Sequence, residues 1–277
     1  MTQATNAQDG RGFGDHLQLE RLDGGIVLLR LNRPERLNAL SDEMVADLDP
    51  LLASLAHDDT ARVVVITGNG RGFCAGFDLS LAATAPRQDE LGEAAAWTAR
   101  QEAFAQLVTR MRALRQPVIA AVNGPANGAG LGLALAAEIR YAGASAAFNA
   151  AFVKVGMSSC DIGVSWLLPR CVGLSRSFEM MLTGRVVDAA EAERIGLVTA
   201  TVPDDQLLPR ALATAREIAA NSSFAVWMTK RGGWANAEAS SLQAAIELEN
   251  RTQILTRTTG ELQRAAQALV TRRRNKA

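Results

Sequence analysis

The chain has 277 residues, 48% of them apolar, and its 29 basic side chains balance its 29 acidic ones. This length and apolar content suit a soluble protein with a sizeable core, and the zero net charge gives no indication of a nucleic-acid or membrane-surface partner. Three cysteines and two histidines lie far apart in the sequence, which argues against a zinc site and leaves a reducing cytoplasm as the default location. No apolar run is long enough to span a bilayer.

The N-terminal part of the chain predicts a tail, a strand hairpin and a helix. Residues 1–16 are polar and glycine-rich and lack the apolar centre of a secretory signal, so a flexible tail is expected. Leu17–Leu22 and Ile26–Leu31 have the composition of strands, and the glycine turn between them predicts a hairpin. Ser41 is placed to cap a helix that runs to about His57.

Glycines gather directly after the next predicted strand. Val63–Ile66 is a short β-branched run, typical of a buried strand, and Thr67–Leu79 then carries glycine at positions 68, 70, 72 and 76. Glycine permits turns that a Cβ blocks, and free backbone N–H groups at such a turn hold developing negative charge. A tight surface loop is the alternative, because loops favour glycine in any case.

A similar arrangement recurs further along the chain. Ala82–Gly92 is aperiodic and predicts a mobile loop near the mouth of a site, and Trp97–Leu114 has helical periodicity. Pro117–Val122 is then a second short apolar strand, followed by the glycine-rich run Asn123–Gly132 and a helix pattern from about Ala129. A strand, a glycine turn and a helix start therefore occur twice.

Two such turns would aim two backbone N–H donors at one oxygen, which is an oxyanion hole made of main chain. A nucleotide-binding loop is the alternative interpretation of these glycines. Gly128, Gly130 and Gly132 alternate, so the spacing G-x-G-x-x-G is not met, and no G-x-x-x-x-G-K-[ST] is present. The nucleotide interpretation is therefore set aside.

The rest of the chain is predicted to be mainly helical. Asp188–Ile195 has the pattern of a short helix with an aspartate cap, and Leu197–Val202 that of a strand. Further helices are expected at Asp204–Ala220, Ser223–Trp234, Ser240–Thr256 and Thr258–Arg272. Lys230, within the second of these, is expected to be solvated.

Four segments in this order resemble the crotonase family, also called the enoyl-CoA hydratase/isomerase superfamily. They are Leu31–Leu40, Phe73–Leu79, Asn123–Gly132, and Leu168–Gly173 with the nearby Met181–Arg185. The resemblance covers roughly residues 17–230. It implies an α/β fold built as a crotonase-like spiral of repeated ββα units, with the spiral core over residues 17–202. It also implies a C-terminal helical trimerisation region over residues 203–277 and assembly as a homotrimer or hexamer.

The resemblance further implies which residues form the site. The backbone N–H groups of Phe77 and Ala129 take the place of the oxyanion donors. The residues implied for substrate and coenzyme A binding are Arg36, Asn38, Ala39, Arg71, Ala75, Gly76, Asp78, Leu79, Gly128 and Gly130. Those implied for the acyl pocket are Trp97, Phe152, Met157 and Trp166. No metal or redox cofactor is implied, and coenzyme A arrives as part of the thioester substrate.

Two positions depart from the hydratase pattern of the family. Gly132 and Phe152 stand where hydratases carry the two glutamates that position and activate water, and neither side chain transfers a proton. Asp161 remains, at a place where some family members hold a catalytic aspartate, and its apolar neighbours are expected to raise its pKa. The alternative role for Asp161 is an N-cap of the helix expected at Gly163–Cys171, worth about 1 kcal/mol.

Three functions stay open at this point. The preferred one is an acyl-CoA thioester enzyme that stabilises an enolate in a backbone oxyanion hole and shifts a double bond, with Asp161 as acid and base. The second is an enoyl-CoA hydratase in which Asp161 or another acid activates water. The third is a non-catalytic acyl-CoA-binding protein, which has no need of two converging donors.

Overall fold

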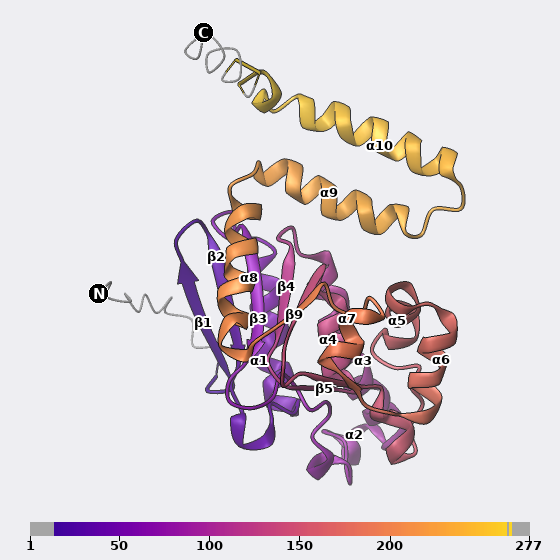
Figure 1. Cartoon of the computed structure of the whole chain (residues 1–277). Helices are drawn as coiled ribbons and strands as arrows, with labels where there is room; N and C mark the ends of the chain where they lie inside the picture. The colour runs from indigo at the N-terminus through magenta and orange to yellow at the C-terminus, as the bar shows by residue number, and fades with distance from the viewer. Residues whose placement is uncertain (1–13, 265, 268–277) are drawn as a thin grey trace.

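The main layer of the computed structural model, which describes residues 14–264 and 266–267, is a six-stranded sheet in the order β1-β2-β3-β4-β6-β9 (Figure 1). The strands are β1 (Leu17–Leu22), β2 (Ile26–Leu31), β3 (Val63–Gly68), β4 (Val118–Val122), β6 (Ile139–Gly143) and β9 (Ala200–Val202). β1 and β2 form the predicted antiparallel hairpin, and the later neighbours in this sheet pair in parallel. β3 and β4 are buried on both faces, which explains their unbroken apolar sequences.

The strands of a second, smaller sheet are interspersed with those of the large sheet along the chain. It contains β5 (Pro125–Asn127), β7 (Ala147–Asn149) and β8 (Val187–Asp188), in that order. Cys74 pairs with Ala126 of β5, so the segment after β3 also joins this sheet. The chain therefore passes repeatedly from a strand of the large sheet to a segment of the small sheet and then to a helix. This repetition confirms the predicted spiral of ββα units.

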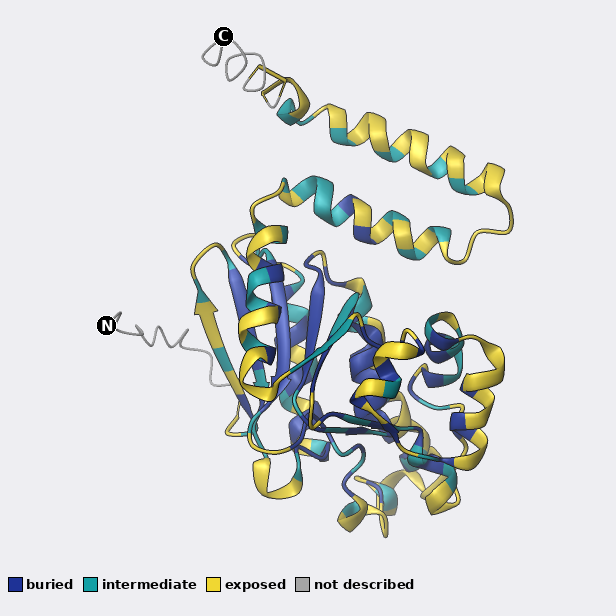
Figure 2. Ribbon diagram, viewed as in Figure 1, coloured by how far each residue is buried: buried dark blue, intermediate teal, exposed yellow. Residues whose placement is uncertain are grey.

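Helices cover both faces of the large sheet (Figure 1, Figure 2). The main core cluster joins one face of the sheet to α1 (Asp42–Leu55), α3 (Glu93–Ala113) and α4 (Ala129–Ala136). A second cluster joins the other face to α8 (Asp204–Ala219). The remaining helices are η1 (Pro34–Arg36), η2 (Leu79–Leu81), α2 (Gln88–Leu91), η3 (Ala151–Val155), α5 (Val164–Val172), α6 (Leu174–Thr183), α7 (Ala189–Arg194), α9 (Ser223–Asn236) and α10 (Leu242–Arg257).

Local capping signals located helix starts correctly. The Ser41 hydroxyl accepts a hydrogen bond from the Met44 amide at 3.2 Å, and Asp188 caps α7 as predicted. The loop expected at Ala82–Gly92 contains the short helix α2, which the aperiodic sequence did not indicate. The helix expected at Thr258–Arg272 lies partly outside the described residues.

A buried ion pair attaches α9 to the body of the protein. The Lys230 ammonium lies 3.1 Å from the Glu138 carboxylate and donates to the carbonyl oxygens of Met111 and Gln116. Burial holds the pKa of Lys230 below its usual range, and the expectation of a solvated lysine is wrong. α10 packs along α9 without burying a side chain of its own, and among the described residues no helix is long and apolar enough for a membrane span.

Candidate active site

The first glycine-rich turn runs beside Leu40. The Leu40 N–H donates to the Gly76 carbonyl oxygen at 2.7 Å. The Leu40 carbonyl oxygen accepts from the Asp78 N–H at 3.0 Å. Successive groups of an extended chain point to opposite sides, so the N–H of Phe77 between them faces away from Leu40. In the second turn, Ala129 is the first residue of α4, and its N–H is one of the donors that a helix start leaves unpaired.

These two amides lie close together because the turns interlock. Within the described chain, neither the Phe77 N–H nor the Ala129 N–H donates to a protein acceptor. A Cβ built on Gly76 would lie 2.7 Å from the Asn127 carbonyl oxygen and 3.5 Å from the Ala129 nitrogen. Gly76 also has a φ of +96°, which disfavours any side chain. The first turn thus packs directly against the start of α4, and each of the two segments carries a free donor.

A short ladder holds the turns in this register. The Cys74 N–H donates to the Pro125 carbonyl oxygen, and the Cys74 carbonyl oxygen accepts from the Asn127 N–H, both at 3.0 Å. Gly130 permits the close crossing, because its Cβ would lie 2.0 Å from the Cys74 carbonyl oxygen. Burial raises the pKa of the Cys74 thiol to about 12, so this cysteine is a packing residue rather than a nucleophile.

Side chains of the predicted binding segment stabilise the first turn. The Arg33 guanidinium lies 3.0 Å from the Asp78 carboxylate and donates to the Ala39 carbonyl oxygen at 2.6 Å. Asp78 also accepts from the hydroxyl and the amide of Ser80, and these bonds hold its pKa below its usual range. Asn38 is fully buried and donates to two carbonyl groups of the glycine-rich turn. The side chains of Asn38 and Asp78 therefore already have protein partners.

Asp161 lies directly before α5 but does not cap it. Gly163 occupies the N-cap position, and no side chain caps this helix, so the N-cap interpretation is wrong. The Asp161 carboxylate instead accepts a hydrogen bond from the Gln101 side chain on α3. Burial raises the pKa of Asp161, and hydrogen bonds from the Ile162 amide and from Gln101 oppose that rise. Asp161 is thus a half-buried carboxylate with a raised pKa that faces α3.

Gly132 and Phe152, which replace the two hydratase glutamates, lie beside Ile162 and Gly128. A Cβ on Gly132 would lie 2.6 Å from Cγ2 of Ile162 and 3.1 Å from its carbonyl oxygen. Ile162 therefore fills the space beside Gly132, one turn along α4 from the free amide. The Phe152 ring lies 3.6 Å from where a Cβ on Gly128 would be. Because Ile162 follows Asp161 in the chain, its contact with Gly132 places this stretch of backbone next to α4.

Helix α3 contacts the first glycine-rich turn and also the segment before α5. The Phe104 ring packs edge-on against the Phe77 ring, with centroids 5.6 Å apart, and the Arg100 guanidinium lies 4.7 Å from the Phe77 centroid. Two nitrogens of Arg100 bind the Asp42 carboxylate at 2.8 and 2.6 Å, which fixes the arginine. The next residue, Gln101, reaches the carboxylate before α5. Helix α3 therefore contacts both Phe77 and the Asp161 carboxylate.

The other predicted site residues differ in exposure. Arg36, Arg71 and Leu79 are exposed on the segments that follow β2 and β3. Met157 is 59% exposed. Trp166 stacks with one arginine from α3 and one from α5, and it packs against a tryptophan of α9. Trp166 thus lies where α5 meets α9, and its ring contacts are not with the residues of the glycine turns.

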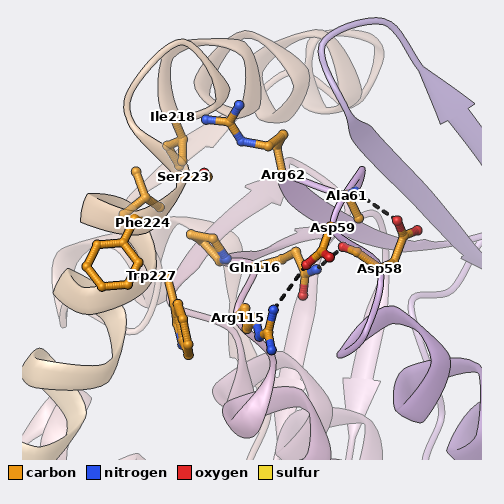
Figure 3. Close-up of a pocket in the computed structure, with 12 residues that line it drawn as sticks. Asp58, Asp59, Ala61, Arg62, Arg115, Gln116, Ile218, Ser223, Phe224 and Trp227 are labelled. Carbon is orange, nitrogen blue, oxygen red and sulfur yellow. Dashed lines mark hydrogen bonds and ion pairs between the residues drawn. The ribbon is translucent and has the colours of Figure 1, made fainter. Parts of the chain in front are cut away.

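A pocket occurs at the other end of the large sheet (Figure 3). The segments that precede β3 and β4 line it together with the junction of α8 and α9. Arg115 pairs there with Asp59 at 3.1 Å and lies 4.8 Å from the centroid of the Trp227 ring. The glycine turns follow the opposite ends of β3 and β4, so this pocket is separate from the predicted site.

Sequence reasoning missed Gln101 and Arg33. Gln101 follows Trp97 by four positions and precedes Phe104 by three, so it is a polar residue within an apolar helical stripe. That interruption was a usable signal. Arg33 acts through Asp78, which lies 45 positions later, and no local pattern indicates such a pair.

Residues 21–276 match the model of the enoyl-CoA hydratase/isomerase family. A relative from Mycobacterium tuberculosis, named as a probable enoyl-CoA hydratase, is 45% identical over 232 residues, which cover 84% of this chain and 81% of the relative. The 1,2-epoxyphenylacetyl-CoA isomerase of Escherichia coli is 37% identical over 258 residues, covering 92% and 95%. The crystal structure of a monofunctional enoyl CoA isomerase from M. smegmatis superposes with a TM-score of 0.71 at 42% identity, covering 84% of this chain and 99% of that one. The chain therefore belongs to the enoyl-CoA hydratase/isomerase family, the crotonase superfamily.

Proposed function

We propose that this protein is an acyl-CoA isomerase that moves a carbon–carbon double bond within the acyl chain of a thioester. The observation that carries the proposal is the combination of two free backbone amides, at Phe77 and Ala129, with one half-buried carboxylate, Asp161. Family membership supplies the substrate class, an acyl-CoA thioester. The residues at the site supply the type of reaction.

In the proposed reaction, the two amides hold the thioester oxygen, and each donor lowers the barrier by about 3 kcal/mol. The Ala129 amide adds the partial positive charge of the α4 start. Asp161 removes a proton from carbon 2 of a 3-enoyl thioester, the electron pair of that C–H bond forms a double bond between carbons 1 and 2, and the carbonyl π pair moves onto the thioester oxygen. The same carboxyl group then returns the proton to carbon 4, which leaves a 2-enoyl thioester. One proton moves and no electron is lost, so the step requires no metal or redox cofactor.

Crowding at Gly132 favours this reaction over hydration. Adding water across a double bond requires one group to deliver a proton and another to accept one. Ile162 occupies the space that a side chain at Gly132 would need, and Phe152 presents a hydrocarbon ring at the second position. A single carboxylate is sufficient for a double-bond shift, because the same group takes and returns the proton.

The names of the relatives support two candidates. Two similar proteins are named as isomerases, one of 1,2-epoxyphenylacetyl-CoA and one of enoyl-CoA, whereas the relative from M. tuberculosis is named as a probable hydratase. Hydration with Asp161 as the water-activating acid is therefore the second candidate.

Product analysis in deuterated water tests the proposal. Purified protein is incubated with 3-enoyl-, 3,5-dienoyl- and 2-enoyl-CoA thioesters, and the products are analysed by mass spectrometry. The proposal predicts a shifted double bond in an acyl chain that has gained no water, with deuterium wherever the proton on the Asp161 carboxyl group exchanges with solvent before its return. A 3-hydroxyacyl product would mean that the protein catalyses hydration and not isomerisation. Binding of every thioester without deuterium exchange or turnover would mean that the protein binds acyl-CoA without catalysing a reaction.

Replacing Gly76 with alanine is expected to lower kcat by about a hundredfold, because the added Cβ meets the Asn127 carbonyl oxygen and moves the two amides apart. The measurement is steady-state kinetics on whichever thioester the product analysis identifies. Gly24→Ala is the matched control, since Gly24 also has a positive φ but has no atom within 4 Å of its Cβ position. An equal loss of kcat in both variants would mean that backbone strain alone causes the effect.

We also propose that the protein works as a homotrimer or hexamer in the cytoplasm. The side chains of Leu242, Ile254 and Leu255 on α10 are more than half exposed, which suits contact with another copy. The three cysteines are unpaired, which suits a reducing compartment. Light scattering that reports a monomer at micromolar concentration would contradict the assembly.

A further inference from the structure

We propose that Gln101 is a positioning residue that holds the Asp161 carboxylate in the orientation for proton transfer; this inference rests on the proposed function. The Gln101 side-chain amide donates to Oδ1 of Asp161. Among the described residues it is the only side chain bonded to that carboxylate. A neutral donor fixes the orientation of the carboxylate without pairing it with a charge.

The position of Gln101 on α3 fixes the place of its side chain relative to Phe77 and Asp161. Its neighbour Arg100 lies over the Phe77 ring and is clamped by Asp42, and Phe104, one turn later, packs against the same ring. The residue that supplies the first amide and the residue that supplies the acid therefore both touch one turn of one helix. Groups held on a rigid helix are placed more accurately than groups on loops.

The backbone after Asp161 explains why the carboxylate needs a tether. Ile162 has a φ of +42° and Gly163 a φ of +79°, and a left-handed conformation is strained for a β-branched residue such as Ile162. This turn releases Asp161 from the N-cap position of α5. A carboxylate without that cap rotates among its side-chain rotamers unless another group holds it.

The arginines of the two helices that flank Asp161 have partners of their own. Arg100 on α3 binds Asp42, and Arg112 on the same helix lies between two indole rings. Arg170 on α5 lies 3.5 Å from the centroid of the Trp166 ring. The groups that stabilise the ionised Asp161 are thus the uncharged amides of Gln101 and Ile162, which work against the pKa increase that burial causes.

Two variants of Gln101 separate positioning from packing. Gln101→Leu removes the donor at similar size, and we expect the pKa of Asp161 to rise by about one unit, with kcat about tenfold lower at neutral pH and KM little changed. Gln101→Glu puts a second carboxylate beside Asp161, so the pKa is expected to rise further, by about two units. Gln106→Glu makes the same charge change at another exposed position of α3, one without a bond to Asp161, and is expected to leave that pKa in place.

The measurement is carbon NMR of carboxyl-labelled aspartate, titrated without substrate, with the Asp161 signal assigned by its loss in Asp161→Asn. The pH dependence of kcat is measured beside it. An unchanged Asp161 titration in Gln101→Leu would overturn the inference, as would an equal shift in Gln106→Glu. A shifted titration in a protein that turns over no thioester would support the contact and reject the proposed function, so the two failures are distinct.

Discussion

Asp161→Asn is expected to lower kcat for the double-bond shift by about a thousandfold, because asparagine keeps the size of the side chain but takes no proton. KM is expected to change little, since the backbone amides at Phe77 and Ala129, which are proposed to hold the thioester, are untouched. The measurement is steady-state isomerisation of a 3-enoyl-CoA thioester, followed by absorbance of the conjugated product.

Asp205→Asn is the matched control, because Asp205 is exposed on α8, which covers the opposite face of the sheet. Its kcat should equal that of the wild type. Full activity in Asp161→Asn would remove this carboxylate from the mechanism, whereas equal losses in both variants would point to a general effect of removing charge. Thermal unfolding of both variants checks that the folded state is retained.

The pH dependence of the wild-type enzyme follows from the same group. The proposed step begins with ionised Asp161, and burial raises its pKa above the ordinary value for an aspartate. Activity should therefore fall as the pH drops, with a midpoint above that ordinary value, and this acidic limb should be missing from the residual activity of Asp161→Asn.

Signals carried by neighbouring residues were sufficient to predict most of the fold. The hairpin at residues 17–31 follows from two apolar runs and a glycine turn, and α1 and α7 start at the serine and aspartate caps that precede them. The start of α4 at Ala129 follows from the change from glycine to leucine and alanine. Each of these features depends on interactions within a few positions of the chain, which a single sequence displays.

Contacts between distant segments limited the prediction of the site. Gln101 and Asp161 are 60 positions apart, and the Trp234 indole donates to Glu138 across 96 positions. Lys230 was expected in solvent because the sequence shows no partner for a single lysine on a helix. In the structure it pairs with Glu138, which lies just after α4. Pairing of this kind is decided by the packing of whole helices, and periodicity describes only one helix at a time.

The release of Asp161 from the N-cap position was likewise beyond local reasoning. An aspartate before a helix pattern is usually a cap, and only the left-handed turn at Ile162 and Gly163 moves the cap by two residues. The departure from a local rule coincides with the residue proposed to carry the chemistry. Strained turns that free a polar side chain are typical of functional sites.

Gly132→Glu is expected to produce a destabilised protein with no hydratase activity, although it restores one side chain of the hydratase pattern. The new Cβ would lie 2.6 Å from Cγ2 of Ile162, and overpacking of this kind costs about 1–3 kcal/mol. The carboxylate would also enter a helix whose residues are all buried, which adds a desolvation cost. Urea unfolding and the assay of 2-enoyl-CoA hydration measure the two effects.

Alanine variants isolate the steric part of this prediction. Gly132→Ala should lower the free energy of unfolding, whereas Gly233→Ala, on an exposed and open part of α9, should raise it by about 0.5–1 kcal/mol through helix propensity alone. Ile162→Ala removes the opposing methyl group, so the double variant Gly132→Ala/Ile162→Ala should be more stable than the sum of the single changes predicts. Additive effects, or hydration by Gly132→Glu at a rate comparable to isomerisation, would mean that Ile162 does not exclude the glutamate.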